Sequence, residues 1–437
     1  MWLTACISNY KMRSTALILG LLATSSAFAG NFAIQTAYPS DPAGNALTPN
    51  LGEPFWMTVR YQVGQAQSGS MRVSTPWTGL SSSVFTSQAG TQQATYGPLV
   101  PLFDGTIPIR VQVGDASADV SVTPAAPQVS IEYFNPRSWQ ADFGASIQFK
   151  PGAPTKVDWY VPKAPSLGFQ SIFTTRLFEG TLVAQDVFKQ ININQTGSAF
   201  QSTSSSVRVG ANALRKVKFD TLKILPASVK LFLKSETLIE SGDKNVKTLV
   251  SNTLGKNFQK TMPVYDAAQS LYRAVINRIQ YVDATNGRPS AAQALKTGYG
   301  DCGFFASAFS AACRNAGIPA RPITGFLAGP DEWHVWAEFY VPGHGWIPVD
   351  PSYADGKDPQ GNYALYFGVI PDLNQRVATA IGFDHSFARV KIPMLQSPYA
   401  ITDVKKVLSA SAWCNLVEIA PLENVPSTGE NLLSRRR

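Results

Sequence analysis

The sequence predicts a multidomain chain in which two β-sandwich domains precede an α+β domain. Apolar and polar residues alternate in many segments before residue 209, as they do in half-buried strands. Helical spacing of apolar residues appears only after residue 235. The chain has 437 residues, of which 44% are hydrophobic and 15% are charged, so each domain is large enough to bury a core without disulfide bonds.

Residues 1–29 have the features of a secretory signal peptide. Lys11 and Arg13 precede an apolar run over 16–23, and the small-residue pattern Ala-Phe-Ala at 27–29 is typical of a cleavage site. An uncleaved anchor is the alternative interpretation. Because the apolar run is far shorter than the roughly 20 residues that span a bilayer, we expect cleavage after Ala29 and a secreted or periplasmic protein without a transmembrane segment.

The charge of the chain bears on its partners. The formal net charge is +8, which is small for this length. Proteins that bind nucleic acid usually cluster Lys and Arg on one face, and no such cluster is found, so no nucleic-acid partner is expected. A weakly basic surface is compatible with an anionic polymer of the cell envelope as a partner.

The first β-sandwich domain is predicted over residues 30–123 and the second over 128–209. Apolar residues alternate with smaller or polar ones at 55–63 in the first block and at 129–133 in the second. This pattern favours small antiparallel sandwiches of the immunoglobulin-like (Ig-like) type. Neither block contains a His or a Cys, so we expect roles in binding or spacing for both.

The remainder of the chain is predicted to be a connecting segment at 210–234, the α+β domain at 235–405 and a C-terminal tail at 406–437. Apolar residues recur at helical spacing over 266–279, which predicts a helix there. The composition also shifts toward Lys, Leu and Ala beyond residue 210. Any catalytic chemistry is therefore expected in the α+β domain.

Removal of the signal peptide takes away Cys6 and leaves Cys302, Cys313 and Cys414. In an oxidising compartment an odd number means that one thiol is either kept for chemistry or buried and inert. Cys313 and Cys414 fit the inert interpretation. The spacing of Cys and His residues supports no zinc site, so we expect neither a metal nor a cofactor.

Cys302 is predicted to open a helix. Gly298 and Gly300 precede it, an Ala-rich run follows, and Gly317 ends the run. A thiol at a helix N-terminus lies near unpaired amide donors and the positive end of the helix dipole, which favours the nucleophilic thiolate. Cys313 lies about 16 Å further along the same helix axis, so the two cysteines cannot form a disulfide.

A β-hairpin is predicted over 334–350, with a turn rich in Pro and Gly at 341–345. If Tyr340 faces Trp346, then His334 and Asp350 are diagonal neighbours on one sheet face, about 7 Å apart at Cβ. A register slip of one residue would place them on opposite faces. In the first register the carboxylate orients the imidazole, which takes the proton of a thiol.

The chain has three histidines, so few candidates exist for a general base. His344 lies in the predicted turn and is interpreted as an exposed residue. His385, beside Asp384, is the alternative base to His334. Other residues near the hairpin have two interpretations: Arg321 and Glu338 are a candidate ion pair, and the neighbouring tryptophans fill the core or line an acyl-binding slot. These tryptophans are Trp333, Trp336 and Trp346.

Several motifs follow one another between residues 235 and 352. They are Gly300-Asp301-Cys302, Cys313-Arg314-Asn315-Ala316-Gly317-Ile318-Pro319-Ala320-Arg321, Gly325-Phe326, Trp333-His334-Val335-Trp336-Ala337-Glu338 and Gly345-Trp346-Ile347-Pro348-Val349-Asp350-Pro351. In this order they resemble the bacterial transglutaminase-like superfamily. The resemblance implies a papain-like α+β core with a catalytic triad in which Cys302 is the nucleophile, His334 the base and acid, and Asp350 the orienting carboxylate.

The activity that the resemblance implies is acyl transfer from an amide or peptide bond of a protein or peptide substrate, through a thioester on Cys302. Animal transglutaminases carry a Trp directly after the nucleophile and another upstream that supports the oxyanion. Here Gly303 follows Cys302, and residues 235–301 contain no Trp. This departure favours hydrolysis over cross-linking. The second oxyanion donor stays open among Tyr265, Gln269 and Tyr272.

The alternative function is that of a catalytically silent transglutaminase-like fold that serves as a binding or assembly module of the cell envelope, because many copies of a fold lose their chemistry. The β-sandwich domains would then be the working parts. Retention of Cys302, His334 and Asp350 together argues against this alternative.

Overall fold

The computed structural model describes residues 31–421 with internal gaps. The gaps are residues 52, 76–78, 82–84, 100, 102–105, 126–129, 151–156, 176–179, 185–188, 194–198, 284–287, 331, 355–365 and 388–389. The expected signal peptide at 1–29 lies outside the described residues. Within the described part of the chain, no helix has both the length and the apolar character needed to cross a bilayer.

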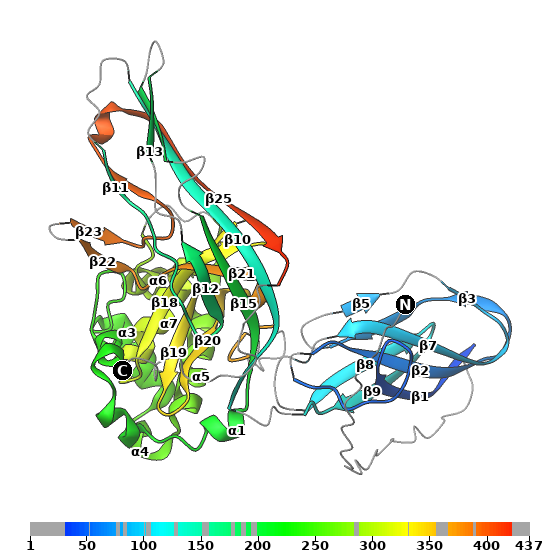
Figure 1. The fold of residues 1–437 in the computed structure, drawn as a ribbon. Helices are drawn as coiled ribbons and strands as arrows, with labels where there is room; N and C mark the ends of the chain where they lie inside the picture. Colours follow the sequence, from blue (N-terminus) through cyan, green and yellow to red (C-terminus); the bar gives the residue numbers. More distant parts are fainter. Residues whose placement is uncertain are drawn as a thin grey trace, which may run out of the picture.

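The first β-rich region is built from strands in several sheets. One sheet has the order β1 (Phe32–Ser40), β2 (Phe55–Val63), β7 (Gly90–Leu99), a second has the order β5 (Gly79–Ser81), β4 (Met71–Ser74), β8 (Ile107–Val113), β9 (Ala116–Val122), and β3 (Gln67–Gly69) pairs with β6 (Phe85–Ser87). The first two sheets share one hydrophobic core, and β1 contacts β8 and β9 (Figure 1). The alternation at 55–63 is confirmed as β2, whereas the Ig-like identity stays a prediction.

The second β-rich region differs from the separate sandwich expected over 128–209. All its described strands except β11 (Asp158–Tyr160) belong to one six-stranded sheet of order β12 (Gln170–Thr175), β15 (Ala199–Val209), β10 (Ile131–Phe149), β14 (Lys189–Ile193), β13 (Gly180–Ala184), with β25 (Val407–Ile419) on the other edge of β10. The expected C-terminal tail at 406–437 thus includes a strand. The physical reason is that the backbone of β25 pairs with β10 from Ser138 to Phe149, a contact between segments far apart in sequence (Figure 1).

The α+β part contains a four-stranded sheet and eight helices among the described residues. The sheet has the order β20 (Gly345–Val349), β19 (Glu332–Val341), β18 (Ala320–Leu327), β21 (Arg376–Ile381). The helices are α1 (Ala211–Leu214), α2 (Ala227–Lys230), α3 (Lys244–Leu254), α4 (Phe258–Thr261), α5 (Val264–Arg278), α6 (Ala291–Thr297), α7 (Cys302–Asn315) and α8 (Pro351–Ala354). The helix predicted over 266–279 is confirmed as α5.

Short elements complete the chain. Strand β11 (Asp158–Tyr160) pairs with β24 (Tyr399–Ile401), β16 (Gln280–Tyr281) with β17 (Tyr299–Gly300), and β22 (Asp384–Phe387) with β23 (Val390–Pro393). The 3-10 helices are η1 (Phe219–Ile224), η2 (Leu231–Leu233), η3 (Leu373–Gln375) and η4 (Val404–Lys406). Of these, β17 matters for the site because it leads the chain into α7, and β16 pairs with it.

The four-stranded sheet is covered on both faces. Helix α7 contacts β18 and β19, and alternate residues of β19, such as Val335 and Phe339, join the core that α7 fills with Ala and Phe side chains (Figure 1). The intervening Trp336 joins a different core, together with Phe169 and with Val207 of the six-stranded sheet. Alternate side chains of β19 therefore pack on opposite faces of the sheet, one set against the α7 side and the other against the six-stranded sheet.

Gly325 of β18 gives the fully buried Trp336 its space. Gly325 pairs with His334 of the neighbouring strand β19. A Cβ atom at residue 325 would overlap the Val377 carbonyl oxygen and would lie 2.7 Å from Trp336 Cη2. A side chain here would therefore push the backbone of β21 or the Trp336 ring, which stacks at a ring-centroid distance of 6.3 Å from His334.

We expect Gly325→Ala to lower the free energy of unfolding by about 1–3 kcal/mol, because overpacking in a tight core forces backbone and side chains to shift. Denaturant titration of both proteins measures the difference. Gly329→Ala is the matched control, since the nearest atom to its added Cβ would be Gln375 Oε1 at 3.5 Å. Equal unfolding midpoints for the two variants would show that residue 325 tolerates a side chain and would contradict the expected overpacking.

Candidate active site

Cys302 is the first residue of α7, as predicted. Asp301 precedes it in an extended conformation, and its Oδ1 accepts a hydrogen bond from the Gly303 N–H at 3.0 Å. An Asp in this position satisfies one of the helix N-terminal amides and favours helix initiation there. The thiol is half-buried at the helix start, whereas the rest of α7 is packed into the core.

The glycine that follows Cys302 has a packing reason. A Cβ atom at Gly303 would lie 2.9 Å from Pro289 Cβ and 3.3 Å from Asp301 Oδ1. Pro289 belongs to the segment that enters α6, so this segment covers the first turn of α7 closely. A large side chain after the nucleophile, such as the Trp of animal transglutaminases, does not fit this arrangement.

The predicted hairpin and its register are confirmed. Tyr340 of β19 pairs with Trp346 of β20, and Glu338 pairs with Pro348. Asp350 directly follows β20, and its Oδ2 lies 2.7 Å from His334 Nε2. Both side chains are buried, His334 at 3% exposure and Asp350 at 0%. The register therefore places the imidazole and the carboxylate in direct contact.

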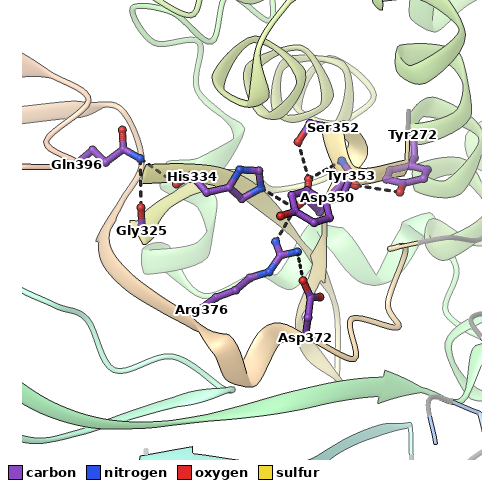
Figure 2. Close-up of polar contacts among 9 residues, drawn as sticks. All are labelled: Tyr272, Gly325, His334, Asp350, Ser352, Tyr353, Asp372, Arg376 and Gln396. Atoms are coloured by element: carbon purple, nitrogen blue, oxygen red, sulfur yellow. Dashed lines mark hydrogen bonds and ion pairs between the residues drawn. The ribbon is translucent and has the colours of Figure 1, made fainter. Parts of the chain in front are cut away.

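The Asp350 carboxylate accepts four hydrogen bonds from the described residues, as Figure 2 shows. His334 Nε2 and Arg376 Nη1 contact Oδ2 at 2.7 Å and 2.5 Å. The Ser352 hydroxyl and the Tyr353 N–H donate to Oδ1 at 2.7 Å and 3.2 Å. A buried charge is stable only when such donors surround it. The four donors therefore keep the carboxylate ionised and fix its orientation.

The environment shifts the pKa values of both partners. Burial alone would lower the pKa of His334, but the negative charge and hydrogen bond of Asp350, together with the influence of Cys302, raise it to about 9. Burial alone would raise the pKa of Asp350, but His334 and Arg376 hold it well below its usual range. Because Nε2 contacts the carboxylate, Nδ1 is the ring nitrogen left for the Cys302 thiol.

The other histidines and cysteines lie elsewhere. His344 lies in the turn between β19 and β20, where partial burial lowers its pKa. His385 lies on β22, with Nε2 at 3.1 Å from the Gly382 carbonyl oxygen. None of Cys302, Cys313 and Cys414 forms a disulfide within the described part of the chain, which agrees with the prediction that Cys302 and Cys313 form none.

Tyr281 is a site residue that the sequence did not indicate. It lies on β16, where it pairs with Gly300, and its ring packs against Phe305 of α7 at 6.2 Å. Burial raises the pKa of its hydroxyl, and the charge of an ionised Cys302 raises it further. The hydroxyl therefore stays protonated at neutral pH.

The three candidates for the second oxyanion donor, Tyr265, Gln269 and Tyr272, belong to α5. Tyr265 packs against Phe339 at 6.1 Å, and the Tyr272 hydroxyl donates to the backbone carbonyl of Asp350 at 3.2 Å. Both side chains belong to the hydrophobic core. Gln269 is half-buried on the same helix.

Further residues hold the site in place. Gln396 Nε2 donates to the backbone carbonyls of His334 at 3.0 Å and Gly325 at 3.2 Å, which ties a distant segment to β18 and β19 (Figure 2). The candidate ion pair of Arg321 and Glu338 is confirmed at 2.7 Å. Among the tryptophans, Trp336 is in the core, Trp333 packs against Phe326, and Trp346 lies over Arg321 at 3.9 Å.

Comparison with known proteins identifies the family of this region. Residues 252–351 match the family model of the transglutaminase-like superfamily, and this range includes Cys302, His334 and Asp350. The chain contains a transglutaminase-like domain. A protein-glutamine gamma-glutamyltransferase of Pseudomonas aeruginosa is 35% identical over 66 residues, which are 12% of this chain and 10% of that protein. The chain thus aligns with a tenth of the length of this relative.

Two solved structures align with the chain with low similarity scores. "A Putative Cysteine Protease from Cytophaga hutchinsonii" is 19% identical with a TM-score of 0.43, and the match covers 67% of this chain and 94% of that one. "A Putative Protease from Parabacteroides distasonis" is 10% identical with a TM-score of 0.25, with coverages of 69% and 65%.

The stability of the transglutaminase-like domain should depend on His334 most strongly at low pH. The pKa of His334 is raised from 6.5 to about 9, so its protonated form stabilises the fold fully below about pH 6.5. This contribution is lost as the pH rises through about 9. We expect His334→Gln to lower the denaturant midpoint more at about pH 6 than at about pH 10.

His344→Gln is the matched control for this experiment, because His344 lies in a turn and its pKa is lowered. Its effect on the midpoint should be small at both pH values. A His334→Gln deficit that grows with pH would contradict the assignment of a raised pKa to His334.

Proposed function

We propose that the chain is a secreted or periplasmic thiol enzyme that transfers an acyl group from an amide or peptide bond through a thioester on Cys302. The observation that carries this proposal is the 2.7 Å contact of His334 Nε2 with Asp350 Oδ2, at a site where Cys302 also contributes to the raised pKa of His334. A nucleophile, a base and an orienting carboxylate in this order are what thioester chemistry requires.

In the first half of the reaction, His334 Nδ1 accepts the thiol proton and the sulfur of Cys302 attacks the carbonyl carbon of the substrate. The C–N bond then breaks, and the imidazolium of His334 gives its proton to the departing amine. Asp350 keeps the ring in the tautomer and orientation that leave Nδ1 toward the sulfur. The product of this half is a thioester and a free amine.

The oxyanion of the tetrahedral intermediate needs donors that are fixed before the reaction. We assign one to the backbone N–H of Cys302 at the start of α7 and the second to the Tyr281 hydroxyl. Two observations support Tyr281. It lies on β16 and pairs with Gly300, which precedes Cys302 by two residues in the sequence, and its ring contacts Phe305 of α7. Its raised pKa keeps the hydroxyl a donor.

In the second half, an acceptor attacks the thioester while His334 removes a proton from it. Water as the acceptor gives hydrolysis, and a primary amine gives cross-linking or exchange. We favour water, because Gly303, packed against Pro289, replaces the Trp that follows the nucleophile in animal transglutaminases. The proposed substrate is a protein or peptide, including peptides of the cell envelope.

Cys302 should react with iodoacetamide at about pH 7 faster than a free model thiol, because His334 accepts its proton. Mass spectrometry after brief labelling measures the rate for each cysteine, with the buried Cys313 as the internal control. We expect His334→Ala to slow labelling of Cys302 by on the order of tenfold or more. Labelling of Cys302 no faster than the model thiol would favour the alternative of a binding module.

A glutamine-containing peptide, incubated with and without a primary amine, then separates the two acceptors. We expect release of ammonia in both samples, with the free acid as the main product even when the amine is present. Amine-coupled peptide as the main product would show that the enzyme is a cross-linker instead.

Tyr281→Phe should slow acylation of Cys302 by on the order of 100-fold, because it removes a donor to the oxyanion. The burst of nitrophenolate from p-nitrophenyl acetate measures acylation. Alkylation by iodoacetamide forms no oxyanion, so its rate should not change. Tyr299→Phe on the neighbouring strand, 54% exposed, is the matched control. Acylation at the wild-type rate, or equal losses in both reactions, would contradict the assignment.

A further inference from the structure

Arg376 is a fully buried cation that shares one oxygen atom with the proposed base. Its Nη1 lies 2.5 Å from Asp350 Oδ2, and the same Oδ2 is 2.7 Å from His334 Nε2. The Arg376 side chain has no solvent exposure, so its charge acts in a medium that screens it weakly. We propose that Arg376 acts through Asp350 to limit how tightly His334 holds its proton.

The orientation of the carboxylate does not depend on Arg376 alone. The other oxygen, Oδ1, accepts hydrogen bonds from the Ser352 hydroxyl at 2.7 Å and the Tyr353 N–H at 3.2 Å. Both donors belong to α8, which directly follows Asp350. These contacts hold the carboxylate plane even without the guanidinium, so the distinct contribution of Arg376 is its positive charge.

The guanidinium itself is fixed on several sides. Nη2 contacts Asp372 Oδ2 at 2.9 Å, and its carbon lies over the rings of Tyr353 at 4.8 Å, Trp336 at 5.7 Å and Tyr366 at 5.8 Å. Cation–π contacts of this kind favour the charged group over a polar neutral one. The charge next to Oδ2 is therefore permanent over the pH range in which His334 titrates.

The role of Arg376 follows from the two proton transfers that His334 makes in the reaction, so this inference rests on the proposed function. His334 must first take a proton from the thiol and then give it to the departing amine. A buried carboxylate with no other cation would stabilise the imidazolium strongly and retain that proton. Because Arg376 neutralises part of the charge on Oδ2 and repels the imidazolium, it makes the second transfer easier.

The titratable and charged groups that face this assembly come from six places. They are Cys302 of α7, His334 and Glu332 of β19, Asp350 after β20, Tyr353 of α8 with Tyr366, and Asp372 before η3. Asp350 and Cys302 act directly on the pKa of His334, and Asp350 stays ionised because its own pKa is held well below its usual range. Replacing Cys302 by Ala removes the effect of the thiol and isolates the effect of Arg376.

The experiment is an NMR titration of the His334 imidazole in the full chain carrying Cys302→Ala. The sequence has three histidines, so His334→Gln assigns its signal directly. We expect Arg376→Met to move the His334 midpoint upward by about one pH unit, a tenfold change in proton affinity. Asp372→Asn should move it downward, because it leaves more of the Arg376 charge unbalanced.

Arg321→Met is the matched control, because it also removes a buried arginine from an ion pair, in this case with Glu338 at 2.7 Å. It should leave the His334 midpoint unchanged. An unchanged or lowered midpoint in Arg376→Met would overturn the proposal. If that variant does not fold, Asp372→Asn decides alone, since an unchanged or raised midpoint there also overturns it.

The readout does not depend on turnover, so the two proposals can fail separately. A wild-type chain that forms no thioester would remove the proposed function and leave the titration result standing. An active wild type with no response of His334 to Arg376→Met would remove the inference alone. In the active enzyme, the same substitution should move the high-pH limb of acylation in the same direction as the titration.

Discussion

The buried carboxylate of Asp350 is the constraint on which the rest of the site depends. It has no exposure to solvent, and its donors are His334 from β19, Arg376 from β21, and Ser352 and Tyr353 from α8. A buried ion that loses a partner costs several kcal/mol, so strands and helix must all be in place together. The site is therefore complete only when β19, β21 and α8 are all in place.

The position of the nucleophile depends on helix α7. Helix α7 begins at Cys302 because Asp301 caps it, and its Ala and Phe side chains fill the space between β19 and the other helices. A helix packed on all sides cannot shift along its axis without opening the core. The start of α7, which carries the Cys302 thiol, is thus fixed relative to the hairpin that carries His334. Only side-chain rotations can then change the distance between the two groups.

Local sequence patterns predicted the hairpin but not the residues from other segments that support it. Alternation along β19 and the turn at 341–345 fix the register, because a slip of one residue would turn buried side chains outward. Arg376 and Gln396 reach the site from later segments without any periodic signal. In the same way, β25 joins β10 by backbone pairing between segments far apart in the chain, so the sequence suggested a tail instead.

The central claim is that Cys302 carries the acyl group in a site assembled around Asp350. Mass spectrometry of the chain, quenched in acid soon after mixing with an activated ester, tests it most directly. We predict one added acyl group, located on the peptide that contains Cys302, and its loss when His334 is replaced by Ala. An acyl group on another residue, or equal labelling after replacement of Cys302 by Ala, would contradict the claim.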